Sequence, residues 1–155
     1  YKGIDLSIFF QWSYGNDIMN ANRLFFESGN NKSRELNQYA SYANRWTPEN
    51  PTSDIPSATD SSSNRVFSSR IIEDGSFLRL KNVTLGYTFP AQMTRKWKID
   101  KARVYVAAQN LWTWTSYSGY DPEVSVRSSS ALTPGLDYSS YPRAYSISFG
   151  VSLGF

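Results

Sequence analysis

Few residues of this chain have the types and spacing that catalysis requires. Asp121-Pro122-Glu123 places two carboxylates in one short segment, and paired carboxylates can perform general acid–base chemistry. Two acids beside a proline are more often a solvated turn. The sequence contains neither histidine nor cysteine, which excludes a Ser-His-Asp triad, thiol chemistry, disulfides and the usual zinc sites. We therefore expect that the protein is not an enzyme and that it has no metal site and no bound cofactor.

Aromatic side chains are the stronger candidates for ligand contact. The chain contains 11 Tyr and 5 Trp, and several of them lie in segments rich in Ser, Asn and Gly. Such rings can stack on sugar rings or contact a covering protein, although packing within the loops is the commoner role. The candidate ligand or lid contacts are Trp46, Tyr117, Tyr120 and Tyr138, with Tyr39 and Tyr42 as further loop aromatics.

The elements that must position these loops are strands, and the last strand has the clearest pattern. From residue 145 to 155, every odd position is apolar and every even position is Ser or Gly. Only a β-strand has a side-chain period of two, so one face is wholly apolar. A tilted strand of about 9–11 residues crosses the hydrocarbon of a bilayer. The apolar positions are Tyr145, Ile147, Phe149, Val151, Leu153 and Phe155.

Three earlier segments alternate in a similar way, so four strands are expected. Their approximate bounds are 3-14, 76-89, 102-115 and 143-155. No segment approaches the length of a transmembrane helix, and the mean hydropathy is −0.48. The absence of a long apolar run excludes helical spans but not barrel strands, whose signal is alternation. The sequence thus predicts an all-β fold of the transmembrane antiparallel β-barrel kind, with a soluble β-domain as the alternative.

The alternation breaks at two places. In the second strand the apolar positions change phase near Lys81 or Asn82, which predicts a β-bulge. In the third strand the phase beyond Gln109 stays open, because Asn110 would face the apolar side if alternation continued.

The connections between strands are long, short and long, at about 15–75, 90–101 and 116–142. The first is expected to carry short helices at about 17–26 and 33–46, and the short one a helical turn. Outer-membrane barrels have long extracellular loops and short periplasmic turns, so the two long connections are expected outside the cell.

This orientation places aromatic residues at both ends of the strands, as expected for interfacial girdles. The outer set is Trp12, Tyr14, Trp112, Trp114 and Tyr145, and the inner set is Tyr87, Phe89 and Phe155.

Four strands cannot close a barrel, and an open sheet edge in lipid leaves backbone groups unpaired. Partner strands are therefore expected outside this sequence. Because no signal peptide precedes Tyr1, we expect this to be a segment of a longer chain.

Several motifs together resemble one family. Residues 74–87 read Asp-Gly-Ser-Phe-Leu-Arg-Leu-Lys-Asn-Val-Thr-Leu-Gly-Tyr, and residues 108–114 read Ala-Gln-Asn-Leu-Trp-Thr-Trp. With Gly-Tyr-Asp-Pro-Glu at 119–123, Arg-Trp-Thr-Pro-Glu-Asn at 45–50 and the terminal Gly-Phe, this order resembles the C-terminal segment of SusC/RagA-like TonB-dependent outer-membrane transporters. The resemblance covers essentially the whole chain.

The resemblance implies a barrel of about 22 strands with an N-terminal plug, of which this sequence would be the last four strands. It also implies energy from TonB through the absent N-terminal part and a SusD-like lipoprotein over the extracellular mouth. The implied cargo is an oligosaccharide or a peptide. A passive porin or structural outer-membrane barrel, and a soluble carbohydrate-binding β-domain, are the alternatives. The Lys and Arg residues are scattered, so no nucleic-acid partner is expected.

The terminal strand carries a further expectation. In outer-membrane proteins, an apolar face that ends on an aromatic residue resembles the signal read by the barrel-assembly machinery. The six apolar residues from Tyr145 to Phe155 are therefore the candidate assembly signal. Simple packing against outer-membrane lipid is the alternative role for Phe155.

Overall fold

The computed structural model describes residues 1–28, 37–58, 67–125 and 134–155, and these form two compact units. The sheet unit consists of Tyr1–Tyr14, Phe77–Thr115 and Arg143–Phe155. The loop unit consists of Gly15–Ser76 and Ser116–Pro142. In the described ranges, no helix has the length and apolarity needed to span a membrane.

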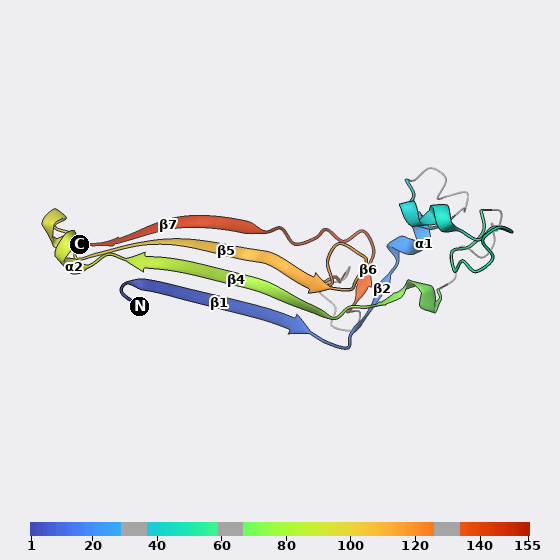
Figure 1. The fold of residues 1–155 in the computed structure, drawn as a ribbon, viewed down its shortest axis with the longest axis horizontal. Helices are drawn as coiled ribbons and strands as arrows, with labels where there is room; N and C mark the ends of the chain where they lie inside the picture. The colour runs from blue at the N-terminus through green and yellow to red at the C-terminus, as the bar shows by residue number, and fades with distance from the viewer. Residues whose placement is uncertain (29–36, 59–66, 126–133) are drawn as a thin grey trace. The chain divides into compact units, whose positions relative to one another are not determined.

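The sheet unit contains four antiparallel strands in the order β1-β4-β5-β7. They are β1 (Ile4–Ser13), β4 (Phe77–Thr88), β5 (Lys101–Thr115) and β7 (Ser146–Gly154). The strands lie side by side in chain order, as Figure 1 shows. The predicted β-rich architecture is confirmed, and β7 begins later than the expected residue 143.

The pairing register separates an apolar face from a polar one. Leu6 pairs with Leu85, Leu85 with Val106, and Val106 with Phe149, so one apolar row crosses all four strands. The neighbouring row contains Ser7, Thr84, Ala107 and Ser148 and lies on the opposite face. On the apolar face Phe149 is 83% exposed, although large apolar side chains are normally buried against a partner or lipid.

Two irregularities keep this separation along the full strands. The β1–β4 register shifts between Phe9, opposite Asn82, and Phe10, opposite Leu80, so Lys81 is the extra residue of a bulge, as the sequence predicts. The Lys81 amine donates to the Gln11 side chain. On β5, Asn110 has φ +51°, a left-handed conformation that Asn tolerates better than most residues. Its amide nitrogen donates to the Ala144 carbonyl at 3.2 Å, so the apparent phase conflict is a local kink.

The polar face holds a cluster near the ends of β1 and β5. Arg103 reaches past Gly86 to Asp5, with its Nε 3.1 Å from one carboxylate oxygen and a terminal nitrogen 2.5 Å from the other. A Cβ at Gly86 would collide with both of these side chains. The Tyr105 ring occupies the space above Gly150 on the neighbouring strand, so glycine is required there too. Arg103 also lies over the Tyr105 ring at 5.1 Å from its centroid.

Aromatic residues cluster at both ends of the apolar face. At one end Trp12 pairs with Leu78, and Leu78 pairs with Trp114. At the other end Tyr87 and Phe89 make an edge-to-face contact with ring centroids 5.1 Å apart. Tryptophan and tyrosine belts at two depths are typical of strands that cross a bilayer.

The short connection and both termini lie at the same end of the sheet (Figure 1). The connection contains α2 (Ala91–Thr94) and η4 (Arg95–Trp97), close to the single helical turn that the sequence predicts. Because neighbouring strands are antiparallel, both long connections leave from the opposite end of the strands.

The loop unit has its own small sheet and core. Its elements are β2 (Asp17–Asn20), α1 (Asn22–Phe26), η2 (Ala40–Asn44), η3 (Ser69–Ile71), β3 (Ile72–Asp74) and β6 (Leu136–Asp137). The sheet order is β3-β2-β6, with β2 antiparallel to β3 and parallel to β6. Ile18, Leu24 and Ile71 are buried in its core.

The helix expected at about 17–26 is wrong over its first turn. Ile18 is fully buried in β2, and pairing with β3 and β6 satisfies the backbone of this segment. The helix begins only at Asn22. Of the second expected helix, at about 33–46, residues 33–36 lie outside the described residues, and the described part contains the 3₁₀ helix η2.

The two faces of β7 provide a direct test. We expect Phe149→Arg to destabilise folding into lipid by roughly 2–4 kcal/mol, because this face is expected in hydrocarbon, which solvates a charge poorly. Ser148→Arg, its neighbour on the polar face, should cost much less. The measurement is folding of each full-length variant into lipid vesicles, and equal effects would contradict the assigned faces.

Candidate ligand site in the loop unit

In the loop unit, hydrogen bonds between residues that are far apart in the sequence join the two long connections. The Met19 N–H donates to the Gly135 carbonyl at 2.8 Å, and the Ala21 N–H donates to the Asp137 carbonyl at 2.9 Å. The Ser139 N–H donates to the Asn22 side-chain oxygen at 2.7 Å. These contacts fix α1 beside the segment that follows β6.

A buried ion-pair network surrounds Glu27, whose side chain is 4% exposed. Its carboxylate accepts hydrogen bonds from Arg23 Nε at 2.9 Å, from an Arg70 guanidinium nitrogen at 2.6 Å and from the Ser41 hydroxyl at 2.7 Å. Arg23 also donates to the Arg70 carbonyl at 2.8 Å. The network therefore links α1 to η3 through charges that neutralise each other.

Glu73 connects this network to the second long connection. Its carboxylate accepts bonds from the Ser118 N–H at 2.9 Å, the Ser118 hydroxyl at 2.8 Å and the Asn20 amide at 3.1 Å. Burial opposes ionisation of Glu73, but these hydrogen bonds and nearby Arg23 outweigh it and hold the pKa of Glu73 below its ordinary value. Glu73 is thus an ionised acceptor that orders both connections at neutral pH.

Tyr117 has a structural role. Its side chain is 6% exposed, and its hydroxyl donates to the Asp137 carboxylate at 2.6 Å. Burial, with the adjacent Asp137 carboxylate, raises the pKa of Tyr117 well above its ordinary value. The neutral phenol thus acts as a permanent donor to Asp137, and its ring packs with Ile18 and Val124.

A hollow of about 620 Å³ lies between the two long connections, and we call it the tyrosine groove. The first connection lines it with Asn22, Phe26, Asn37, Gln38 and Tyr39. The second lines it with Tyr120, Ser139, Ser140, Tyr141 and Pro142. Its volume is within the range of about 300–1,000 Å³ that is usual for small-ligand sites.

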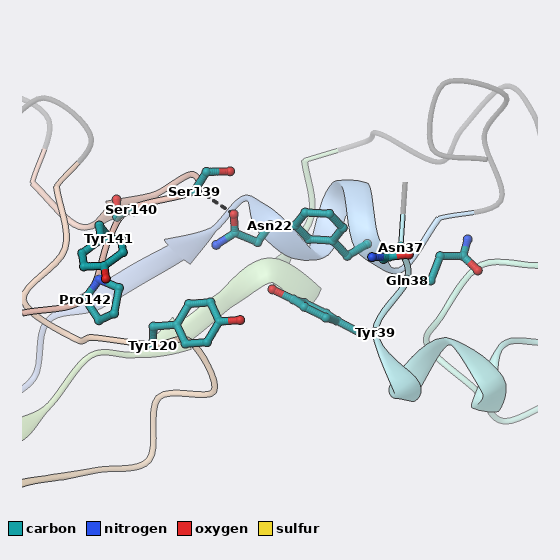
Figure 2. Close-up of a pocket in the computed structure, with 10 residues that line it drawn as sticks. Asn22, Asn37, Gln38, Tyr39, Tyr120, Ser139, Ser140, Tyr141 and Pro142 are labelled. Carbon is teal, nitrogen blue, oxygen red and sulfur yellow. Dashed lines mark hydrogen bonds between the residues drawn. The ribbon is translucent and has the colours of Figure 1, made fainter. Parts of the chain in front are cut away.

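The tyrosine groove combines open aromatic rings with uncharged polar groups (Figure 2). Tyr141 is 92% exposed and Tyr120 is 78% exposed. Tyr39 packs on Phe26 with ring centroids 5.2 Å apart, and the hydroxyl ends of Tyr39 and Tyr120 point toward one another. Burial, together with Tyr120 and nearby carboxylates, raises the pKa of Tyr39, so its hydroxyl stays protonated at neutral pH.

A second hollow, of about 670 Å³, shares Tyr39 and Tyr120 with the tyrosine groove. Its other lining side chains include Arg23, Glu27 and Glu73. These charges already pair with one another in the network described above. This hollow is thus lined by a charge-balanced structural network.

The structure distributes the sequence-predicted loop aromatics over different roles. Tyr120 lines both hollows. Tyr138 packs against Phe25 with centroids 5.2 Å apart. Trp46 is 42% exposed, and its backbone N–H donates to the Ile55 carbonyl. Tyr117 is buried, so in this structure its ring is closed to a ligand.

Sequence reasoning missed Tyr141 and the amides of the tyrosine groove. Tyr141 lies in an irregular segment before β7, where no spacing rule relates it to Asn22 or Asn37. Tyr39 was named only as a general loop aromatic. The composition of residues 137–142 contains a signal, because Tyr and Ser together are enriched in the binding loops of antibodies.

The structure also describes the predicted carboxylate turn and the candidate assembly residues. Asp121 is 4% exposed and accepts a hydrogen bond from the Glu123 N–H at 2.9 Å, so the predicted turn is present but Asp121 in it is buried and not solvated. Of the candidate assembly residues, Ile147, Phe149, Val151 and Leu153 lie on β7 and are exposed. Tyr145 and Phe155 flank the strand and are also exposed. Their role in assembly stays a prediction.

Comparison with known proteins identifies relatives along the whole chain. The sequence is 36% identical, over all of its length, to TonB-dependent receptor P3 and to TonB-dependent receptor P26 of Formosa agariphila. It is 40% identical over 54% of its length to TonB-dependent receptor SusC of Bacteroides thetaiotaomicron. The chain spans 15% of receptor P3, 16% of receptor P26 and 8% of SusC. No family model matches.

Solved structures give the same result. The chain superimposes over 99% of its length on a chain of the RagAB peptide transporter, with a TM-score of 0.81 and 32% sequence identity. It superimposes over 100% of its length on a chain of the RagAB peptide importer in the open-open state, with a TM-score of 0.82. In both cases it covers 16% of the matched chain.

The Glu27 network predicts a localised loss of stability. Glu27→Ala should destabilise the loop unit by about 3–5 kcal/mol, because it leaves the partly buried Arg23 and Arg70 without their shared carboxylate. The measurement is the rate of proteolytic cleavage within residues 15–76 of the full-length protein in detergent. Glu49→Ala, at an exposed position of the same connection, is the matched control. Equal cleavage of the two variants would contradict a stabilising network.

Proposed function

We propose a function for this chain from the family to which it belongs, the SusC/RagA-like TonB-dependent receptors. The chain forms part of an outer-membrane active transporter that imports oligosaccharides or peptides. TonB supplies the energy through another part of the receptor, and a SusD-like surface lipoprotein covers the extracellular mouth. The chain itself has a structural and ligand-contacting role and is not an enzyme.

The observation that carries this proposal is the end-to-end match to the RagAB chains. The match includes the loop unit as well as the sheet unit, since 99–100% of the chain superimposes at 32% identity. Similarity in the loops is informative, because loops vary more among relatives than the elements they connect. RagAB is a peptide importer, and SusC shares 40% identity with about half of this chain.

The structure of the sheet unit supports a place in the barrel wall. Its apolar face would meet outer-membrane lipid, and its polar face would line the lumen around the plug. In the described part of the chain, β1 and β7 are each paired along one edge only. Strand edges in lipid need partners, so the remainder of the barrel would supply them. Assembly would require the barrel-assembly machinery.

Connection length and aromatic position support an orientation in the membrane. Residues 15–75 and 116–142 would be extracellular, and residues 90–101 would be periplasmic. The loop unit would then lie on the side where cargo and the SusD-like lipoprotein arrive. A passive porin has the same strand pattern, so dependence on TonB is the property that would distinguish the proposed active transporter from a porin.

Uptake by cells tests the function. In a Gram-negative host that lacks the receptor, the full-length receptor with its lipoprotein should restore growth on an oligosaccharide or an oligopeptide as a sole nutrient. Growth should cease again when TonB is deleted, because no other energy source acts at the outer membrane. Restored growth without TonB would indicate a passive porin, and growth on neither nutrient class would contradict import.

Cysteine labelling tests the orientation, since the chain has no native cysteine. Thr52→Cys and Lys96→Cys are both at exposed positions, in a long and in the short connection. On intact cells, an impermeant thiol reagent should label Thr52→Cys and not Lys96→Cys. The reverse pattern would invert the proposed topology.

A further inference from the structure

We infer that the tyrosine groove is a binding site for a neutral oligosaccharide, with the rings of Tyr120 and Tyr141 as its stacking surfaces. The inference rests on the proposed import function. It narrows the cargo from an oligosaccharide or a peptide to an uncharged oligosaccharide, and it assigns a site within this chain.

The first argument is the exposure of the two rings. Tyr141 and Tyr120 are 92% and 78% exposed, yet both border the same hollow. Phe26 and Tyr39, which pack against each other, line the groove from the first long connection. Aromatic rings that gain little from the protein's own packing are available to cover the C–H face of a sugar ring.

The second argument is the chemistry of the polar groups. The Asn22 side-chain oxygen is held by the Ser139 N–H, and this fixes the orientation of the amide. Its nitrogen has no partner in the described part of the chain, and it lies on the side that faces Tyr120 and Tyr141 in Figure 2. Amides and hydroxyls can both donate and accept hydrogen bonds, as sugar hydroxyls do.

The third argument is charge. Among the described residues that line the tyrosine groove, none is Lys, Arg, Asp or Glu. A peptide carries charged termini and side chains, and taking them out of water requires opposite charges nearby. Arg23, Glu27 and Glu73, which line the second hollow, are committed to their own network. Asp137, beside the groove, already accepts hydrogen bonds from the Tyr117 hydroxyl and the Ser140 N–H.

The fourth argument is the absence of a strand edge. Extended peptides are commonly bound by adding a strand to an exposed sheet edge, whose backbone pairs with theirs. The described lining residues lie in α1 and in irregular segments, and none of them lies in β2, β3 or β6. The groove thus offers side chains and no backbone ladder, which suits a sugar better than a peptide.

The test measures binding to the purified full-length receptor–lipoprotein complex in detergent by calorimetry. The probes are neutral oligosaccharides with glucose, galactose, mannose or xylose backbones, and oligopeptides of mixed sequence. We expect at least one oligosaccharide to bind. The double variant Tyr120→Ala/Tyr141→Ala should raise its Kd by about tenfold or more, since two stacking surfaces are lost.

Two controls separate stacking from folding. Tyr120→Phe/Tyr141→Phe keeps both rings and should stay within about threefold of the unchanged complex, because only the hydroxyls are lost. Tyr138→Ala removes a tyrosine of the same connection that packs on Phe25 outside the groove, and it should leave the Kd unchanged.

Several results would overturn the inference. These are an unchanged oligosaccharide Kd in the double alanine variant, binding of oligopeptides alone, or no binding of any probe. Loss of the lipoprotein from the complex with unchanged oligosaccharide affinity would also overturn it, because the rings would then be a protein contact. Tyrosine-dependent binding in a complex that imports nothing would support the site and contradict the proposed function instead.

Discussion

The register of the four antiparallel strands is the constraint on which the rest of the structure depends. Because side chains alternate with a period of two, a slip of one residue would exchange the apolar and polar faces along a whole strand. The bulge at Lys81 and the left-handed Asn110 absorb the two places where the sequence would otherwise break this rule. The glycines under Arg103 and Tyr105 hold the same register on the polar face, since only one pairing puts these side chains over a missing Cβ.

The strands could be predicted from the sequence, because the pattern that indicates each strand lies within the strand's own residues. Each strand carries its own period of two, so its bounds follow from the residues inside it, as with β4 and β5. The β4 bulge was also predictable, because the phase change lies within one strand. The phase beyond Gln109 stays open in the sequence, since the kink at Asn110 depends on the carbonyl of Ala144, in the segment that precedes β7.

The loop unit could not be predicted in the same way, because its structure depends on contacts between distant segments. The pairing of β2 with β6 brings together residues more than one hundred positions apart, and no periodicity reports it. Residues 17–20 have a helical appearance in isolation but are a strand, since β3 and β6 supply partners on both sides. The same distance explains the site: Tyr120 was a candidate by type, whereas Tyr141 and Asn22 became candidates only when folding placed them at one hollow.

In the loop unit, paired charged side chains stabilise the structure, whereas uncharged and aromatic side chains line the candidate ligand site. The charged side chains around Glu27 are buried or half-buried and face each other, as Glu27 does with Arg23 and Arg70. A buried charge without a partner would be costly, so these groups are not free to meet a ligand. The described side chains that line the tyrosine groove are uncharged, and an uncharged surface selects among ligands by shape and hydrogen bonding. Selectivity between neutral and charged cargo would then come from the absence of compensating charge. The hydrogen bonds of Glu73 with Ser118 and of Asn22 with Ser139 hold the two connections together around the groove.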